Sequence, residues 1–183
     1  MKVEQTPLKD CFIIHEKVHK DSRGYFIETF NSRDFKASTG IDIDFVQDNQ
    51  SKSSKGVLRG LHMQKEDTAQ SKLVRVLEGA VLDVALDLRK ESPSFGQHFA
   101  IELTAENHKQ LFVPAGFAHG FVVLSEHATF FYKVDNFYIP GNEVGIMYND
   151  KDLNIDWKLQ VSEIQLSDKD TKLGSFAEYC ASL

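Results

Sequence analysis

The sequence is short of cysteine and of long apolar runs, and each shortage excludes a class of protein. Its two cysteines, Cys11 and Cys180, lie at opposite ends of the chain without a metal-binding spacing. They indicate neither a disulfide framework nor a zinc site, so a reducing compartment is expected. No apolar stretch approaches the length of a membrane helix, and the first residues open no apolar run, so neither a membrane span nor a signal peptide is expected. We therefore expect a cytoplasmic protein.

Basic residues are also in the minority, with 21 Lys and Arg against 27 Asp and Glu, which gives a net charge of −6. This balance predicts no general affinity for nucleic acid or for an anionic membrane surface. If the substrate is an anion, its site must therefore be locally basic. No linker, repeat or low-complexity segment interrupts the 183 residues, so residues 1–183 are expected to form one domain.

Alternating apolar residues and turns dominate what is present, together with fourteen phenylalanines. In 81–88, the apolar residues Leu82, Val84, Leu86 and Leu88 fall on one face of a strand. Further strands are expected at 72–77, 97–103, 109–113, 119–124 and 128–134, with a hairpin turn at Glu78-Gly79 and a tight turn at 114–116.

Helical signals are few. The segment 31–39 is expected to form a short helix capped by Asn31 or Ser32, and Ser167 is expected to cap another near the C-terminus. Many short strands with regular turns predict an all-β fold, a sandwich or a jelly-roll barrel, with short flanking helices.

The run at 56–64, GVLRGLHMQ, carries the clearest chemical signal when it is read with Lys72 and Tyr132. Arg59 offers a planar fork of donors for phosphate, and His62 offers a base that works near neutral pH. Strict alternation would place these two side chains on opposite faces of a strand. A bulge at Gly60 would re-aim one of them into the same pocket.

Each of these residues also has a purely structural interpretation when it is taken alone. Arg59 and Lys72 would be solvated surface charges, and His62 a histidine satisfied within its strand. Tyr132 would be a core tyrosine with a bonded hydroxyl. A motif match of this size does not decide between the two interpretations.

A set of longer blocks resembles one family over nearly the whole chain. The chain is similar to the dTDP-4-dehydrorhamnose 3,5-epimerases, enzymes of nucleotide-sugar synthesis with the cupin-type jelly-roll barrel. The blocks that carry the resemblance are DSRGYFIETF at 21–30, FVQDNQSKS at 45–53, GVLRGLH at 56–62, KLVRVLEGAVLDVALDLRKESPSFG at 72–96, PAGFAHGF at 114–121, FFYK at 130–133, GIMYND at 145–150 and LSDKD at 166–170.

The resemblance implies a role for individual residues. It implies that His62 is the general base, that Asp170 is its partner in a dyad, and that Tyr132 is the general acid. It further implies a set of residues that bind the dTDP-sugar substrate: Arg23, Glu28, Gln47, Asp48, Asn49, Arg59, Lys72, His119, Glu143 and Lys169. Two positions depart from the family pattern, since Met63 stands where an aromatic residue is frequent and Tyr148 where tryptophan is common.

The chemistry that the resemblance implies is proton transfer beside a ketone, without a redox step. Lys72 is our candidate for stabilising the enolate oxygen. No cofactor is therefore expected. The segment 114–119 fits the second motif of metal-binding cupins, but His62-Met63-Gln64 supplies one imidazole where the first motif needs two. We therefore read His119 as a substrate contact and expect no metal.

The resemblance leaves alternatives open. The leading interpretation is epimerisation at both C3 and C5 of a 4-keto-6-deoxy sugar, and the nearest rival is an epimerase acting at one of these carbons. A sugar-sensing cupin without catalysis and a metal-dependent oxygenase are more distant. A homodimer is expected, in which the strand 11–15 crosses to a neighbour and Arg23 or Glu28 completes the partner's site.

Overall fold

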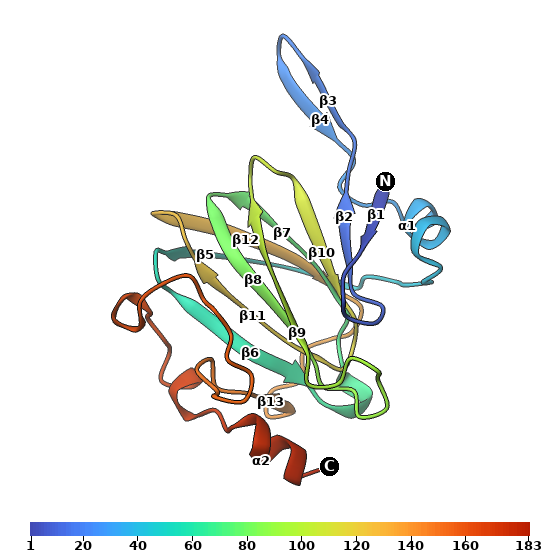
Figure 1. The fold of residues 1–183 in the computed structure, drawn as a ribbon. Coiled ribbons are helices and arrows are strands. Elements are labelled where there is room, and N and C mark those ends of the chain that lie inside the picture. Colours follow the sequence, from blue (N-terminus) through green and yellow to red (C-terminus); the bar gives the residue numbers. More distant parts are fainter.

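The computed structural model describes the backbone of residues 1–183 and every side chain except that of Glu66. Strands dominate it and form two antiparallel sheets (Figure 1). The six-stranded sheet runs in the order β1 (Lys2–Gln5), β2 (Phe12–His15), β10 (Lys109–Val113), β7 (Lys72–Glu78), β12 (His127–Val134) and β5 (Gln47–Ser54). The five-stranded sheet runs in the order β13 (Glu143–Gly145), β6 (Leu58–Gln64), β11 (Phe117–Val123), β8 (Ala80–Asp87) and β9 (His98–Thr104).

The remaining elements are short. β3 (Val18–Asp21) and β4 (Gly24–Ile27) pair only with each other. Two α-helices, α1 (Ser32–Thr39) and α2 (Phe176–Ala181), flank the sheets, and three 3-10 turns are η1 (Glu66–Thr68), η2 (Val161–Glu163) and η3 (Asp170–Lys172). None of the helices in the described chain is long and apolar enough to cross a membrane. The predicted all-β fold with short flanking helices is therefore confirmed.

The core lies between the two sheets, and the alternation predicted along β8 decides what faces it. Val81 and Ala85 point into the core, where they meet Val74 and Phe130 of the six-stranded sheet. The opposite face of β8 is apolar too, because the C-terminal segment covers it. A second buried cluster forms on that face, and its members include Leu82, Val84, Leu86, Leu88, Leu153 and Trp157. With both faces covered, β8 is buried along almost its whole length.

The helix predicted at 31–39 is present, and its caps follow the sequence. Asn31 accepts a hydrogen bond from the backbone N–H of Asp34 at 3.3 Å, and Gly40 ends the helix at φ 76°. Phe35 points down from the helix and packs edge-on against Phe112. The helix thus covers part of the outer face of the six-stranded sheet.

The expected capping role of Ser167 needs correction. Ser167 accepts the backbone N–H of Asp170 at 3.2 Å and so opens the 3-10 turn η3, not an α-helix. The helix near the C-terminus, α2, is capped instead by Ser175, which forms a capping box with Glu178.

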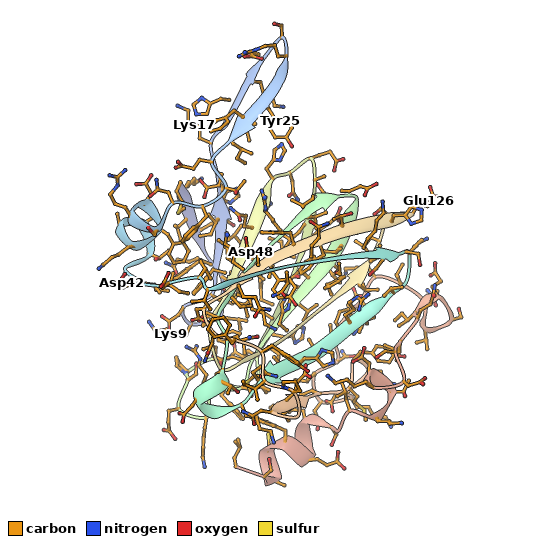
Figure 2. The ribbon with its side chains drawn as sticks, turned by 180° about the vertical axis from the view of Figure 1, so that it is seen from behind. Lys9, Lys17, Tyr25, Asp42, Asp48 and Glu126 are labelled. Carbon is orange, nitrogen blue, oxygen red and sulfur yellow. The ribbon has the colours of Figure 1, made fainter. Side chains whose placement is uncertain are left out.

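The expected crossing of strand 11–15 to a neighbouring chain is not what the structure shows. β2 is paired on one side with β1 and on the other with β10, so its backbone is already used within its own chain. The element that does project from the sheets is the β3–β4 hairpin (Figures 1 and 2). It carries Tyr25 and Phe26, which are 60% and 69% exposed.

Candidate active site

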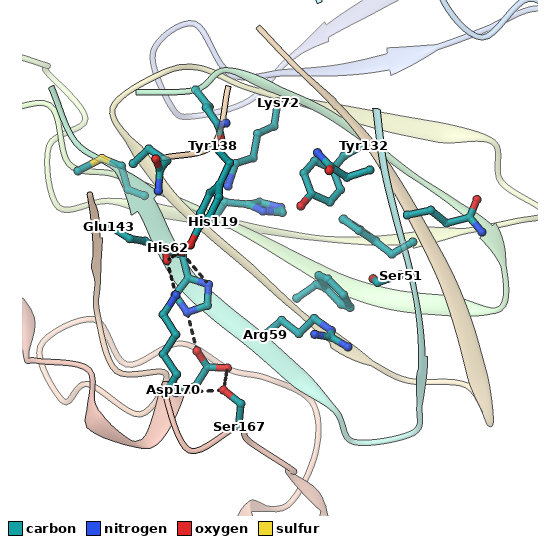
Figure 3. A pocket seen from close by; sticks show the side chains of 18 residues that line it. Ser51, Arg59, His62, Lys72, His119, Tyr132, Tyr138, Glu143, Ser167 and Asp170 are labelled. Atoms are coloured by element: carbon teal, nitrogen blue, oxygen red, sulfur yellow. Dashed lines mark hydrogen bonds and ion pairs between the residues drawn. The ribbon is translucent and has the colours of Figure 1, made fainter. Parts of the chain in front are cut away.

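A cavity of about 450 Å³ lies between the two sheets and is lined by polar and aromatic side chains (Figure 3). It brings together residues that are far apart in the sequence, from β5, β6, β7, β11, β12, β13 and η3. Nine of the predicted site residues line it: Asn49, Arg59, His62, Lys72, His119, Tyr132, Glu143, Lys169 and Asp170.

An irregularity at Gly60 lets Arg59 and His62 share this cavity. The pairing of β6 with β11 changes register between the His119–His62 pair and the Phe121–Arg59 pair. Gly60 has a φ of 120°, and a Cβ atom there would lie 2.6 Å from the Cα of Gly120. Only glycine tolerates this backbone conformation and this close approach. The predicted bulge is therefore confirmed.

His62 is held by a carboxylate from a distant part of the chain. Its Nε2 lies 2.5 Å from Oδ1 of Asp170, which is 5% exposed and sits in η3. Ser167 donates to the second oxygen of that carboxylate at 2.9 Å, which fixes its orientation. The other ring nitrogen, Nδ1, faces the cavity and lies 3.7 Å from Oε1 of Glu143.

The protonation of His62 suits a base. Burial lowers its pKa below the usual value, and this effect outweighs the carboxylates of Asp170 and Glu143, which raise it. The ring is therefore neutral at physiological pH. With Nε2–H donated to Asp170, the lone pair of Nδ1 is available to a proton donor in the cavity.

Lys72 lies at the start of β7 with its ammonium group in the cavity. Burial lowers its pKa to about 8, although Glu143 and Asp83 act in the opposite direction. No side chain that the structure describes forms a hydrogen bond or an ion pair with this ammonium group, whereas Glu143 pairs with Lys169. A buried cation without a protein partner is a candidate for binding negative charge on a ligand.

Tyr132 enters the cavity from β12 of the six-stranded sheet, opposite His62 on the five-stranded sheet (Figure 3). Its ring packs against Phe130, with centroids 6.0 Å apart. Burial raises the pKa of the phenol, although the nearby Arg59 lowers it. The phenol therefore stays protonated near neutral pH and can act as a donor.

A second histidine–carboxylate pair lies beside the first. His119 is the register partner of His62 on β11, and its Nε2 lies 3.0 and 2.9 Å from the two oxygens of Asp83. Arg59 extends along the other side of the cavity, where its Nε and Nη2 donate to Oγ of Ser53 at 3.3 and 3.2 Å.

Four predicted residues do not line the cavity of the single chain. Gln47 comes near it, because it shares a face of β5 with Asn49 and donates to the Asn49 side chain at 2.8 Å. Asp48 points to the opposite face, where it accepts two hydrogen bonds from Lys133. Arg23, which is paired with Asp21, and Glu28 belong to the hairpin region, outside this cavity.

The structure also places in the cavity groups that sequence reasoning did not assign to the site. Ser167 was expected only as a helix cap. Tyr138 follows β12 in a loop without a motif. Asp83, which lies behind His119 and does not line the cavity itself, was given no role. Among the described side chains, no three His, Cys, Asp or Glu residues are grouped as metal ligands.

A cavity in which a histidine–aspartate pair faces a protonated phenol is suited to the acid–base chemistry of an isomerase. The comparisons with known proteins give the family. The model of the dTDP-4-dehydrorhamnose 3,5-epimerase family matches residues 5–178, and the chain belongs to this family. It is 51% identical over 178 residues to the dTDP-4-dehydrorhamnose 3,5-epimerase of Shigella flexneri, a match that covers 97% of each chain.

Solved structures agree with this assignment. The crystal structure of the enzyme of the same name from Elizabethkingia anophelis has a TM-score of 0.94 and 55% identity, and covers 97% of each chain. The structure of a dTDP-6-deoxy-D-glucose-3,5-epimerase from Legionella pneumophila, in complex with dTDP-4-keto-L-rhamnose, has a TM-score of 0.91 and 45% identity. It covers 97% of this chain and 96% of the other. The expected cupin-type barrel is thereby confirmed.

Proposed function

We propose that this protein epimerises C3 and C5 of dTDP-4-dehydro-6-deoxy-D-glucose and so forms dTDP-4-dehydro-L-rhamnose. The observation that carries the proposal is the placement of a neutral histidine and a protonated tyrosine on opposite walls of one cavity. The names of the relatives from Shigella and Elizabethkingia and the ligand of the relative from Legionella support the substrate class.

The first step is proton removal next to the ketone at C4. C3–H and C5–H both flank this carbonyl, and both are axial on the same face of the gluco-configured chair. One base on that face can therefore serve both carbons in turn. His62 takes the proton on Nδ1, while Asp170 accepts the Nε2–H hydrogen bond and stabilises the imidazolium that forms.

The second step is reprotonation from the other face. Removal of the proton leaves an enolate, and the ammonium group of Lys72 stabilises its oxygen. Tyr132 then donates its proton to the carbon from the opposite wall, which inverts the centre. Before the second carbon reacts, the His62 imidazolium releases its proton to solvent and the Tyr132 phenolate takes one up, so both groups return to their starting states. The reaction is redox-neutral at both carbons.

The cationic groups of the cavity hold the nucleotide part. Arg59 and His119 lie beside the reacting groups and are assigned to the diphosphate, for which a guanidinium fork is well suited. Asn49, Glu143 and Lys169 are assigned to the polar rim of the substrate, with Gln47 supporting Asn49. Arg59, Lys72 and Lys169 provide the local positive charge that an anionic substrate needs in an acidic protein.

We further assign the chain to a homodimer in the cytoplasm. The projecting hairpin, with Tyr25 and Phe26 exposed, carries Arg23 and Glu28 away from the cavity of its own chain. A second copy would receive these residues, and Asp48 lies on the outer sheet face as a candidate contact. Light scattering at micromolar concentration should give twice the chain mass. A monomer would contradict the dimer and leave Arg23 and Glu28 without a site.

The experiment that tests the function follows solvent deuterium into the sugar. The protein is incubated in D₂O with the 4-keto-6-deoxy sugar nucleotide, and a reductase then fixes the products. We expect deuterium at both C3 and C5 and a product with both centres inverted. Exchange at one carbon would indicate a single-position epimerase, and exchange at neither would refute the proposal.

A further inference from the structure

Asp83 is a buried carboxylate directly behind His119 of the cavity, and hydrophobic packing does not explain why an acid stands at this position. Its side chain is fully shielded from solvent on β8, between Val81 and Ala85, which belong to the hydrophobic core. Its hydrogen-bond partner among the described side chains is His119, through both carboxylate oxygens. Burying a carboxylate is unfavourable, and replacing a buried ion pair by apolar residues is often neutral or stabilising.

Asp87, the next acid on the same face of β8, shows how this protein satisfies a buried carboxylate that has a structural role. Asp87 is equally buried, but it accepts hydrogen bonds from the Arg89 side chain and from the hydroxyls of Ser92 and Ser94. Its charge is neutralised by a guanidinium that also binds Asp10. Asp83 has no such set of donors among the described residues, and its one hydrogen-bond partner there, His119, lines the cavity.

Its position follows from the register of β8 and β11. Ala85 pairs with His119, and Asp83 pairs with Phe121, so Asp83 and His119 are diagonal neighbours on the inner face of the sheet. Because Nε2 of His119 points at Asp83, Nδ1 is the ring nitrogen left for a ligand. The same carboxylate acts on Lys72, which also projects into the cavity.

We propose that Asp83 is a positioning residue of the reaction: it fixes the ring of His119 and, by its buried charge, keeps Lys72 an ammonium ion while the enolate forms. The inference rests on the proposed function for the role of the ammonium ion, and on geometry for the rest. In the mechanism above, Lys72 can stabilise the enolate oxygen only while it is charged.

The surroundings of Lys72 leave two carboxylates that can provide this support. The cavity presents Glu143 from β13, His119 from β11, His62 and Arg59 from β6, and Tyr132 from β12. Asp83 of β8 lies directly behind His119, outside the lining. Asp135 follows β12 and accepts the backbone N–H of Ser71. Glu143 and Asp83 are the two that raise the pKa of Lys72 against burial. Glu143 is bound to Lys169, whereas Asp83 has no lysine or arginine partner among the described residues.

The test replaces Asp83 by asparagine, which keeps an oxygen for the His119 N–H and removes the charge. The protonation of Lys72 is read directly, by competitive labelling of amines across pH with mass spectrometry of the Lys72 peptide. We expect the labelling midpoint to fall from about 8 by about one pH unit, the lower end of the effect of a close charge. The alkaline limb of kcat/KM should move with it, which gives about a fivefold loss at pH 8 and little change at pH 6.5.

Two controls make the result specific. Glu102→Gln removes an exposed carboxylate from β9, the neighbouring strand, and should leave both midpoints in place. An unmoved Lys72 midpoint in Asp83→Asn, or an equal shift in Glu102→Gln, would overturn the proposal. Because labelling does not depend on turnover, a shifted midpoint in a protein without epimerase activity would refute the proposed function and leave the electrostatic role of Asp83 intact.

A measurement on the wild-type protein covers the case in which Asp83→Asn does not fold. Long-range proton–nitrogen correlation NMR identifies which nitrogens of His119 carry hydrogen. We expect hydrogen on Nε2, which Asp83 accepts. An Nε2 without hydrogen would overturn the positioning role without any substitution.

Discussion

The two histidine–carboxylate pairs of this protein differ although their histidines are register partners on β6 and β11. The His62 side chain is 22% exposed and its carboxylate comes from η3, 108 residues further along the chain. The His119 side chain is 8% exposed and its carboxylate lies on the adjacent strand. The same two functional groups thus occur once in a partly exposed histidine–carboxylate pair and once in a buried one.

This difference decides what each pair can do. The more exposed ring has a free nitrogen at the cavity and a carboxylate at its back, which is the arrangement of a base that must gain and lose a proton. The more buried ring is held by both oxygens of a carboxylate that solvent does not reach, which suits a residue that keeps one orientation while it binds a ligand.

Substitution of each histidine should give the largest effects and the clearest difference between the two pairs. We expect His62→Asn to lower kcat by about 10²- to 10⁴-fold, the usual contribution of a positioned base, with dTDP binding largely retained. His119→Asn should mainly raise KM, because we assign His119 to binding the diphosphate. Turnover and calorimetric dTDP affinity, measured for both variants, check this. Near-normal activity in a folded His62→Asn protein would rule out its assignment as the base.

Tyr132→Phe tests whether the phenol opposite the His62–Asp170 pair is the acid that reprotonates the sugar carbon. Proton removal needs His62, Asp170 and the enolate-stabilising Lys72, all of which remain, whereas inversion needs the phenol. The variant should therefore still exchange substrate hydrogen with D₂O at one carbon at least, while it forms little inverted product. Its fold should survive, since a lost hydroxyl contact costs about 0.5–1.5 kcal/mol.

The informative quantity for this variant is the ratio of exchange rate to epimer yield, relative to the wild type. An equal loss of both would show that Tyr132 positions the sugar and donates no proton to it. Full retention of both would show that another group is the acid.

The pH dependence of kcat/KM should report two groups of the cavity, His62 on the acid limb and Lys72 on the alkaline limb. Activity needs His62 neutral, so kcat/KM falls as pH drops through its pKa, which burial places below the usual 6.5. It also needs Lys72 charged, so kcat/KM falls as pH rises through about 8. A bell-shaped profile with its maximum between these values is expected, and each limb approaches a tenfold change per pH unit. Lys72→Arg should abolish the alkaline limb, and its persistence there would assign it to another group.

Much of the fold could be predicted because its signals are local. Period-two alternation placed β8, turn residues placed the Glu78-Gly79 hairpin, and Asn31 placed the start of α1. The same rule, applied to β5, puts Asp48 and Asn49 on opposite faces, so the position of Asp48 outside the cavity was also accessible from the sequence. The projection of the β3–β4 hairpin away from the two large sheets, in contrast, did not follow from any residue pattern.

The site was less accessible to local reasoning, because its pairs join distant elements. Nothing in the spacing of His62 and Asp170 predicts a contact across 108 residues, and their pairing came from family resemblance. Alternation places Asp83 on the face of β8 opposite that of Leu82 and Val84. Its partner depends on the register between β8 and β11, however, which the sequence of either strand leaves open.

The smallest expected effect sharpens the comparison within the first pair. Ser167 donates a hydrogen bond to the Asp170 carboxylate at 2.9 Å and accepts the Asp170 N–H, so it holds the partner of the base. Ser167→Ala should lower kcat by about two- to tenfold, which corresponds to the roughly 0.5–1.5 kcal/mol of a typical hydrogen bond. Without this donor the carboxylate becomes more basic and holds the imidazolium more strongly. The acid limb should therefore move to higher pH.

A matched serine on the other side of the cavity separates this effect from general loosening. Ser53 accepts two N–H groups of Arg59, and its side chain forms no hydrogen bond with either histidine pair among the described residues. Ser53→Ala should therefore raise KM and leave the acid limb in place. If Ser167→Ala moved neither kcat nor the acid limb, Asp170 would be held by its 3-10 turn alone. The two pairs would then differ in exposure and not in how firmly their carboxylates are oriented.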